Sequence, residues 1–235
     1  MSSEPLTEDE FKDRDALGLK KVEGTPVTEE METKKYMKLL LCVLPMAGLV
    51  LATCLYLLCA KLLGYEAMLE KKFAFISEYD LGYVFLVVWM LAITRAVNIC
   101  RANGARAPAL VDRPDQHVYK IMASSGPLKD APYVMMASTG PQGRFNRAQR
   151  GVFNGDESMP VVLMNAVLSA IVFGPLVPVL CLLIVYGRIT FAKKYKELAT
   201  SRSAGFIPSM IGEQLMQGLV LFTAIKSIFY ERIPF

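Results

Sequence analysis

The chain consists of long apolar runs separated by polar segments. The runs cover residues 36–63, 81–100, the second half of 145–173, 176–195 and 206–230. Each approaches or exceeds the roughly 20 residues that a helix needs to cross a bilayer. They do not alternate between polar and apolar positions, and in lipid only helices and closed barrels satisfy their backbone groups. The pattern therefore predicts an all-α integral membrane protein with five spans.

An acidic, polar tail, residues 1–35, precedes the first predicted span, residues 36–64, in which Pro45 predicts a kink. The tail holds ten Asp and Glu residues, so it resembles neither a secretory signal nor an organellar transit peptide. Its composition predicts disorder when it is alone. The remaining region, residues 78–235, is predicted to be one four-helix membrane domain. It contains a long loop at residues 101–143, which holds five prolines.

The distribution of basic residues predicts the orientation. Seven Lys and Arg residues lie in the tail and its junction with the first span, eight in 101–150 and four in 193–204, against five on the other side. Because basic residues collect on the cytoplasmic side, the N-terminus should face the cytoplasm, the matrix or the stroma. The net charge of +4 is modest, and the basic residues flank apolar runs, so nucleic-acid binding is not expected.

Cysteine and histidine usage argues against metal chemistry. The five cysteines lie in or beside apolar runs without metal-ligand spacing, and reduced buried thiols are the expected state. His117 is the only histidine, and it lies in the predicted loop. A single histidine without clustered acids or cysteines does not predict a metal site, a histidine-based triad or a haem site.

Four polar residues mark the start of the third predicted helix. Arg147, Arg150, Asn154 and Glu157 are spaced three, four and three apart, which places them on one helical face. That face enters the membrane, where ionisable residues suggest function. Two structural interpretations remain open: an interfacial face that binds lipid phosphates, or a salt-bridge ladder between subunits.

A second polar group lies on the same membrane side. Arg188, Phe191 and Tyr195 share a face of the fourth helix, Arg202 follows in a loop, and Arg101 ends the second helix. Each arginine alone could be a snorkelling anchor. Together with the residues of the third helix they predict an arginine-rich pocket with one carboxylate and one amide. Such a pocket suits a zwitterion with more carboxylates than amines, and glutathione is one.

The sequence around these positions resembles the MAPEG family, the membrane-associated proteins in eicosanoid and glutathione metabolism. The stretch R-A-Q-R-G-V-F-N-G-D-E-S-M-P matches the family signature at Arg150, Gly151, Asn154, Glu157 and Pro160. Three other places resemble family positions. They are the Gly187-Arg188 pair followed by Tyr195, Arg202 seven residues after Tyr195, and Arg101 seven residues before Pro108. The resemblance covers about residues 78–230 and is closest to the microsomal glutathione transferases.

The resemblance implies a four-helix bundle, here with one extra N-terminal transmembrane helix, assembled as a homotrimer in membrane lipids. It implies glutathione as co-substrate, no metal, and a lipophilic electrophile or lipid hydroperoxide as acceptor. Arg202 would be catalytic by stabilising the thiolate. Glutathione would be bound between subunits by Arg101, Arg150, Asn154, Glu157 and Tyr195, with Arg147, Arg188 and Ser158 as further candidates. The endoplasmic reticulum is the expected location, with a mitochondrial or plastid membrane as the alternative.

Several features depart from the family pattern. Val152, Ser158 and Phe191 stand where members often carry other polar or aromatic side chains. The loop is longer than usual, and the first helix and acidic tail are additions. An alternative function is therefore a non-catalytic accessory subunit or scaffold of an organellar membrane complex, with partners on residues 1–64 and 101–143. A channel or transporter fits less well, because the sequence has no inverted repeats.

Overall fold

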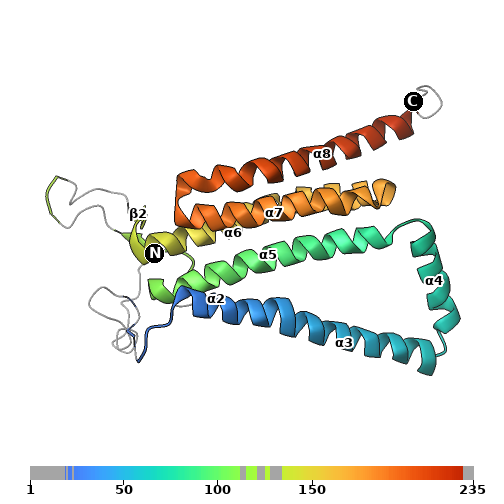
Figure 1. Ribbon diagram of the computed structural model, residues 1–235, viewed down its shortest axis with the longest axis horizontal. Helices are drawn as coiled ribbons and strands as arrows, with labels where there is room; N and C mark the ends of the chain where they lie inside the picture. Colours follow the sequence, from blue (N-terminus) through green and yellow to red (C-terminus); the bar gives the residue numbers. More distant parts are fainter. Residues whose placement is uncertain are drawn as a thin grey trace, which may run out of the picture.

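A computed structural model describes residues 19, 21–22, 24–111, 115–120, 125–127 and 134–229. Helices dominate this part of the chain (Figure 1). In chain order the elements are α2 (Glu29–Met37), η1 (Lys38–Val43), α3 (Leu44–Leu57), η2 (Leu58–Leu62), α4 (Glu66–Glu78), α5 (Gly82–Ala109), β1 (Tyr119–Lys120), β2 (Met135–Met136), α6 (Gly140–Phe173), α7 (Leu176–Glu197), η3 (Ala199–Arg202) and α8 (Ser203–Ile228).

Four helices of the described chain are long and apolar enough to cross a membrane. They are Glu29–Leu62, Gly82–Ala109, Gly140–Phe173 and Leu176–Glu197. The prediction of an all-α, multi-pass membrane protein is confirmed to this extent. The fifth expected span corresponds to α8, which is not among the four. Its sequence contains Glu213 and two glutamines, which lower its hydropathy.

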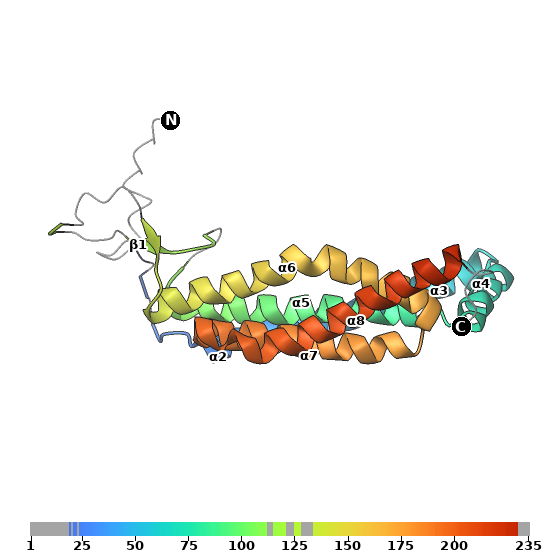
Figure 2. The same cartoon turned by 90° about the horizontal axis from the view of Figure 1, so that it is seen from above.

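Helices α5, α6, α7 and α8 run side by side and form the main body of the molecule (Figure 1; Figure 2). Their shared interior is apolar, and its buried residues recur at helical spacing. The turn at Gly174 and Pro175 between α6 and α7 lies where the sequence predicts it. The buried members of this core are Val87, Leu91, Val162, Ala166, Ala170, Val177, Cys181, Ile184 and Met216.

Small residues allow α7 and α8 to pack closely. A Cβ atom at Gly205 of α8 would collide with the backbone of Phe191 and Gly187 on α7. In the same way a Cβ at Gly187 would collide with Ser209. Such small residues at helix crossings let backbones approach closely in membranes. The close contact fixes α8 against α7 just after the turn that carries Arg202.

The N-terminal helix begins earlier than the sequence predicts, at Glu29 instead of near residue 36. The side chain of Thr28 accepts a hydrogen bond from the backbone N–H of Met31 at 3.3 Å and caps the helix. Glu29, Glu30 and Glu32 occupy its first turn, where acidic side chains are favourable. The acidic tail therefore includes the first two turns of a helix, and residues 1–18 lie outside the described part.

Only the first part of the N-terminal helix packs on the bundle. A Cβ at Gly104 of α5 would collide with the side chain of Thr33, so α2 lies directly against α5. Figure 1 shows α3 diverging from α5 toward α4, and none of the residues of α3 is buried. The π-helical segment η1 ends just before Pro45, whose missing N–H breaks the regular helical bonding at the predicted kink.

The loop predicted for residues 101–143 is shorter than expected. Helix α5 continues to Ala109, because Pro108 lies in its last turn and leaves the preceding turns intact. Helix α6 already begins at Gly140, with Pro141 in its first turn, where a missing N–H has no helical partner. Helix α4, which links α3 to α5, was not predicted. The prediction ends each helix where its apolar run ends, so the extension of α5, the early start of α6 and the charged helix α4 lie outside it.

The buried side chain of Asn146 binds the hairpin between α5 and α6. Strand β1 pairs with β2 in antiparallel register. Asn146 of α6 donates hydrogen bonds to the carbonyl groups of Val118, at 2.8 Å, and Ala137, at 2.9 Å. Its amide oxygen accepts from the N–H of Val118 at 2.8 Å. This anchoring brings the hairpin onto the first turns of α6.

Candidate functional site

The candidate residues gather at the end of the bundle where α6 begins and α7 ends. Arg147 of α6 donates from Nε to the carbonyl of Lys196 on α7 at 3.0 Å. Gly151 lies against α7 one turn further along. Nη1 of Arg188 on α7 donates to the carbonyl of Asn154 at 3.5 Å. The two helices therefore run antiparallel and align residues 147–157 with residues 188–196.

Arg150 and Glu157 are paired with each other on the outer face of α6. Nη1 of Arg150 lies 2.8 Å from Oε1 of Glu157, and Nη2 lies 3.4 Å from Oε2. Both side chains are exposed. The side-chain amide of Asn154 makes no hydrogen bond with any described residue. This outer face thus presents a cation, an anion and an amide that remain accessible.

Two of the further candidates are engaged within the chain. Besides Lys196, Arg147 binds the carbonyl groups of Ser138, at 2.6 Å, and Glu197, at 3.2 Å. Its guanidinium group therefore joins the start of α6 to the end of α7. The hydroxyl of Ser158 donates back to carbonyl groups of its own helix. We assign these two side chains structural roles.

Arg188 forms an ion pair that the sequence analysis did not identify. Its Nη2 lies 2.7 Å from Oε1 of Glu213 on α8, and the two side chains are only 19% and 22% exposed. Together with the bond to Asn154, this pair joins α6, α7 and α8. A lone glutamate in an otherwise apolar helix was the available signal, because a charge at membrane depth requires a partner.

Three further candidates lie on α5, α7 and η3. Arg101 of α5 is partly buried and donates to the carbonyl of Ile189 on α7 at 3.0 Å. The ring of Tyr195 stacks on Phe191 with 5.7 Å between the centroids. Arg202 lies in η3, is exposed, and makes no ion pair or hydrogen bond with any described residue. The structure places all three at the same end of the bundle.

Two polar residues of α5 were also missed. Arg95 pairs with Asp156 of α6, with Nε 2.8 Å from Oδ1. Asn98 lies one turn further along α5 and is only 6% exposed. Its side-chain oxygen accepts no hydrogen bond from any described residue. The Arg95–Asp156 pair therefore joins α5 and α6 at the surface, whereas Asn98 places an amide in the bundle interior.

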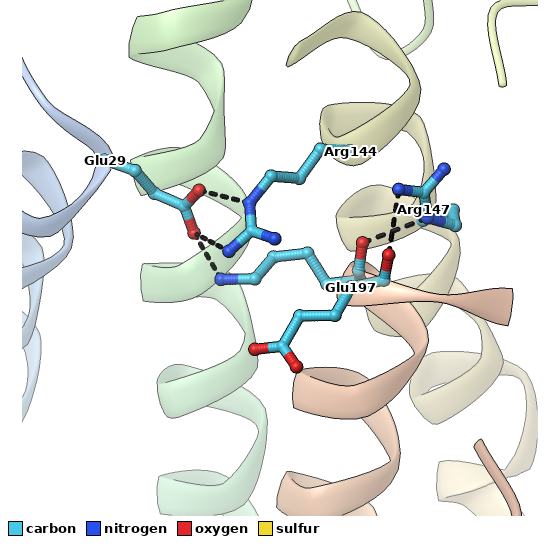
Figure 3. A network of polar contacts seen from close by, with 5 residues as sticks. Glu29, Arg144, Arg147 and Glu197 are labelled. Carbon is cyan, nitrogen blue, oxygen red and sulfur yellow. Dashed lines mark hydrogen bonds and ion pairs between the residues drawn. The ribbon is translucent and has the colours of Figure 1, made fainter. Parts of the chain in front are cut away.

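A charge cluster links the N-terminal helix to the same end of the bundle. The carboxylate of Glu29 binds Arg144 of α6, with Nε and Oε2 2.6 Å apart, and also binds the ammonium group of Lys196 on α7. Figure 3 shows Glu29 pointing toward Arg144, with Arg147 and Glu197 beside them. The side chain of Lys196 is only 9% exposed. This cluster holds α2 against two helices of the main body.

The Glu29→Gln variant should loosen α2. It removes the charge that compensates Arg144 and the nearly buried Lys196, and uncompensated charges of this kind are unfavourable. We expect hydrogen–deuterium exchange in residues 29–37 to accelerate about tenfold or more, since a loss of 1.4 kcal/mol is a factor of ten. The control is Glu30→Gln, which breaks only the exposed pair with Lys34. Equal exchange in both variants would contradict the role of Glu29.

The amino-acid sequence matches no protein-family model and no curated protein. The resemblance to the MAPEG family therefore depends on the residues of α5, α6, α7 and η3 described above. Within the described ranges, no group of three or more His, Cys, Asp or Glu side chains could hold a metal ion. The chemistry that this end of the bundle offers comes from guanidinium, carboxylate, amide and phenol groups.

Proposed function

We propose that the protein is a membrane-bound glutathione transferase or peroxidase of the MAPEG type, acting on lipophilic substrates. One observation carries the proposal: an exposed Arg150–Glu157 pair lies on the face of α6 that also holds Asn154, at the end of the bundle that holds Arg101, Tyr195 and Arg202. The proposal includes five spans, with α8 as the last. It places the N-terminus on the cytoplasmic side of the endoplasmic reticulum membrane.

The Arg150–Glu157 pair is complementary to one end of glutathione. The γ-glutamyl end carries an ammonium and a carboxylate on the same carbon. The ammonium can bind Glu157 while the carboxylate binds Arg150. Opening an exposed ion pair requires only about 1 kcal/mol or less, so the ligand can replace it. Because Arg150 and Glu157 are exposed on the single chain, a second chain is needed to enclose glutathione, in agreement with a homotrimer.

Arg202 is the residue suited to the thiol. It is a cation without a partner among the described residues, and a nearby cation favours the thiolate, which is the nucleophile. In a transferase reaction, the thiolate forms a C–S bond and the leaving group departs with the bonding electrons. With a hydroperoxide, the thiolate attacks the terminal oxygen, an S–O bond forms as the O–O bond breaks, and the alkoxide leaves and takes up a proton. The resulting glutathione sulfenic acid reacts with the thiol of a second glutathione, which forms the disulfide and releases water.

Glutathione binding tests this function. We expect the purified protein to bind radiolabelled glutathione in equilibrium dialysis at concentrations below a few millimolar. Arg150→Gln should weaken binding by about tenfold to a hundredfold, because a hydrogen bond to a charged group contributes about 1.5–3 kcal/mol. Lys193→Gln removes an exposed cation of the same membrane side and serves as the control. Absence of binding, or equal binding by both variants, would refute the proposal.

The second candidate is a non-catalytic accessory subunit or scaffold. The observation that favours it is the N-terminal segment: α3 has no buried residue, and α3 and α4 expose large apolar side chains. Residues 1–64 and 101–143 would then contact other subunits of a membrane complex. Extraction in a mild detergent distinguishes the candidates, because stoichiometric partner proteins should co-purify with an accessory subunit and remain absent from a homotrimeric enzyme.

A further inference from the structure

The segment that leads into strand β1 lies along the first half of α6 (Figure 2). The amide oxygen of Asn146 accepts a hydrogen bond from the backbone N–H of Val118 at 2.8 Å. Three residues further along α6, the buried side chain of Gln149 donates to the side-chain oxygen of Gln116 at 2.6 Å. Residues 116–118 are therefore bound to one face of α6 at both ends of the segment.

The middle residue of this segment, His117, lies beside the face of α6 that carries the Arg150–Glu157 pair. Its ring contacts the ring of Phe153, with 5.6 Å between the centroids. Phe153 follows Arg150 by three residues and precedes Glu157 by four. Residues three and four apart are neighbours on a helix surface, so Phe153 adjoins both members of the pair. His117 is thereby placed at the edge of the proposed glutathione site.

The imidazole of His117 is positioned by ring contacts alone. Besides Phe153, it contacts the ring of Tyr119, with 6.3 Å between the centroids. It is partly exposed, and it makes no hydrogen bond or ion pair with any described residue. An imidazole carries at least one N–H donor in either protonation state. The side chain can therefore donate a hydrogen bond to a ligand oxygen without giving up a contact within the chain.

Glutathione carries a second carboxylate that requires a donor. The pair on α6 accounts for the ammonium and the carboxylate of the γ-glutamyl end, whereas the glycine end carries the other carboxylate. Arg147 and Arg188 are engaged within the chain, and Arg202 is assigned to the thiol. On the hairpin side of the pair, His117 supplies an N–H donor. A ligand held at its γ-glutamyl end can extend over Phe153 toward this donor.

We propose that His117 donates a hydrogen bond to the glycine carboxylate of glutathione. This role rests on the proposed function, because Arg150 and Glu157 must hold the γ-glutamyl end of the ligand. Residues 116–118 then form one wall of the site, so the long loop between α5 and α6 supplies a binding residue. The contact makes the site selective for the complete tripeptide over γ-glutamylcysteine, which lacks the glycine.

Isothermal titration calorimetry of the full-length protein in detergent, with glutathione and with γ-glutamylcysteine, tests this selectivity. We expect the wild-type protein to bind glutathione about tenfold or more tightly than γ-glutamylcysteine, the effect of one hydrogen bond to a charged group. Equal affinity for the two would overturn the inference and leave the proposed function intact. If neither ligand binds, the proposed function is refuted, and the role of His117 is refuted with it.

His117→Phe isolates the contribution of the imidazole nitrogens, because it keeps an aromatic ring on Phe153. The variant should lose about tenfold or more in glutathione affinity, since the hydrogen bond to the carboxylate is lost, while its affinity for γ-glutamylcysteine stays unchanged. An equal loss for both ligands would show that His117 only supports the hairpin. Unchanged glutathione binding would place the glycine carboxylate elsewhere. Either result would overturn the proposal.

Two further variants serve as controls on the same hairpin. Tyr119→Phe removes an exposed hydroxyl next to His117 and should leave the binding of both ligands unchanged. His117→Asn keeps a side-chain N–H and should recover part of the preference for glutathione. If Tyr119→Phe shows the same selective loss as His117→Phe, or if His117→Asn recovers nothing, a hydrogen bond from His117 does not bind the glycine carboxylate.

Discussion

Arg202→Ala should remove most of the glutathione thiolate while leaving the protein folded. An opposite charge close to an ionisable group shifts its pKa by about 1–3 units. An unassisted thiol is only a few per cent ionised at pH 7. We therefore expect the ultraviolet absorbance of bound thiolate at pH 7 to fall about tenfold or more in the variant, and the rate of conjugation to a lipophilic electrophile to fall with it.

Two controls separate this role from a structural one. Arg202 is exposed and makes no ion pair or hydrogen bond with any described residue, so the variant should melt at the wild-type temperature. Arg202→Lys keeps the charge and should recover part of the thiolate signal, and raising the pH should rescue Arg202→Ala. A thiolate signal that is unchanged in Arg202→Ala would eliminate this residue from the mechanism.

Hydrophobic runs located the spanning helices because apolar length is a local property of the sequence. Helix α7 begins at Leu176, where the run after Gly174 and Pro175 predicts it. Helix ends were less predictable, since α5 extends nine residues beyond its apolar run to Ala109. That extension is stabilised by contacts with distant residues, including the stacking of Arg106 on Phe145. Such contacts depend on how the helices pack, and residue spacing does not encode them.

In the candidate site, too, the sequence predicts which helix carries a residue but not which partners its side chain binds. Helical spacing predicts one face for Arg147, Arg150, Asn154 and Glu157, and all four lie on α6. It could not tell that Arg147 binds three carbonyl groups, because two of these belong to α7. Nor could it tell that Arg150 and Glu157, which are seven residues apart, pair with each other. The partners of a polar side chain follow from tertiary packing, whereas its face on a helix follows from sequence alone.

Glu213→Ala should be among the most destabilising single substitutions in the membrane domain. It would leave the guanidinium group of Arg188, which is 19% exposed, without its carboxylate between α7 and α8. Breaking a largely buried ion pair by removing one partner costs about 3–5 kcal/mol. For a chain of this size, such a loss lowers the melting temperature by roughly 10 °C, which thermal unfolding in detergent can measure.

Two comparisons test this interpretation: a double variant that replaces the ion pair with apolar residues, and a single variant that breaks an exposed ion pair. Arg188→Met with Glu213→Leu should restore most of the lost stability, because apolar replacement of a buried ion pair is often neutral or stabilising. Asp156→Ala breaks the more exposed pair with Arg95, and pairs of that kind contribute at most about 1 kcal/mol. If Glu213→Ala and Asp156→Ala lower the melting temperature equally, the Arg188–Glu213 pair does not hold α7 and α8 together. Close packing at small residues, such as Gly205 against Phe191 and Gly187 against Ser209, would then hold these two helices together.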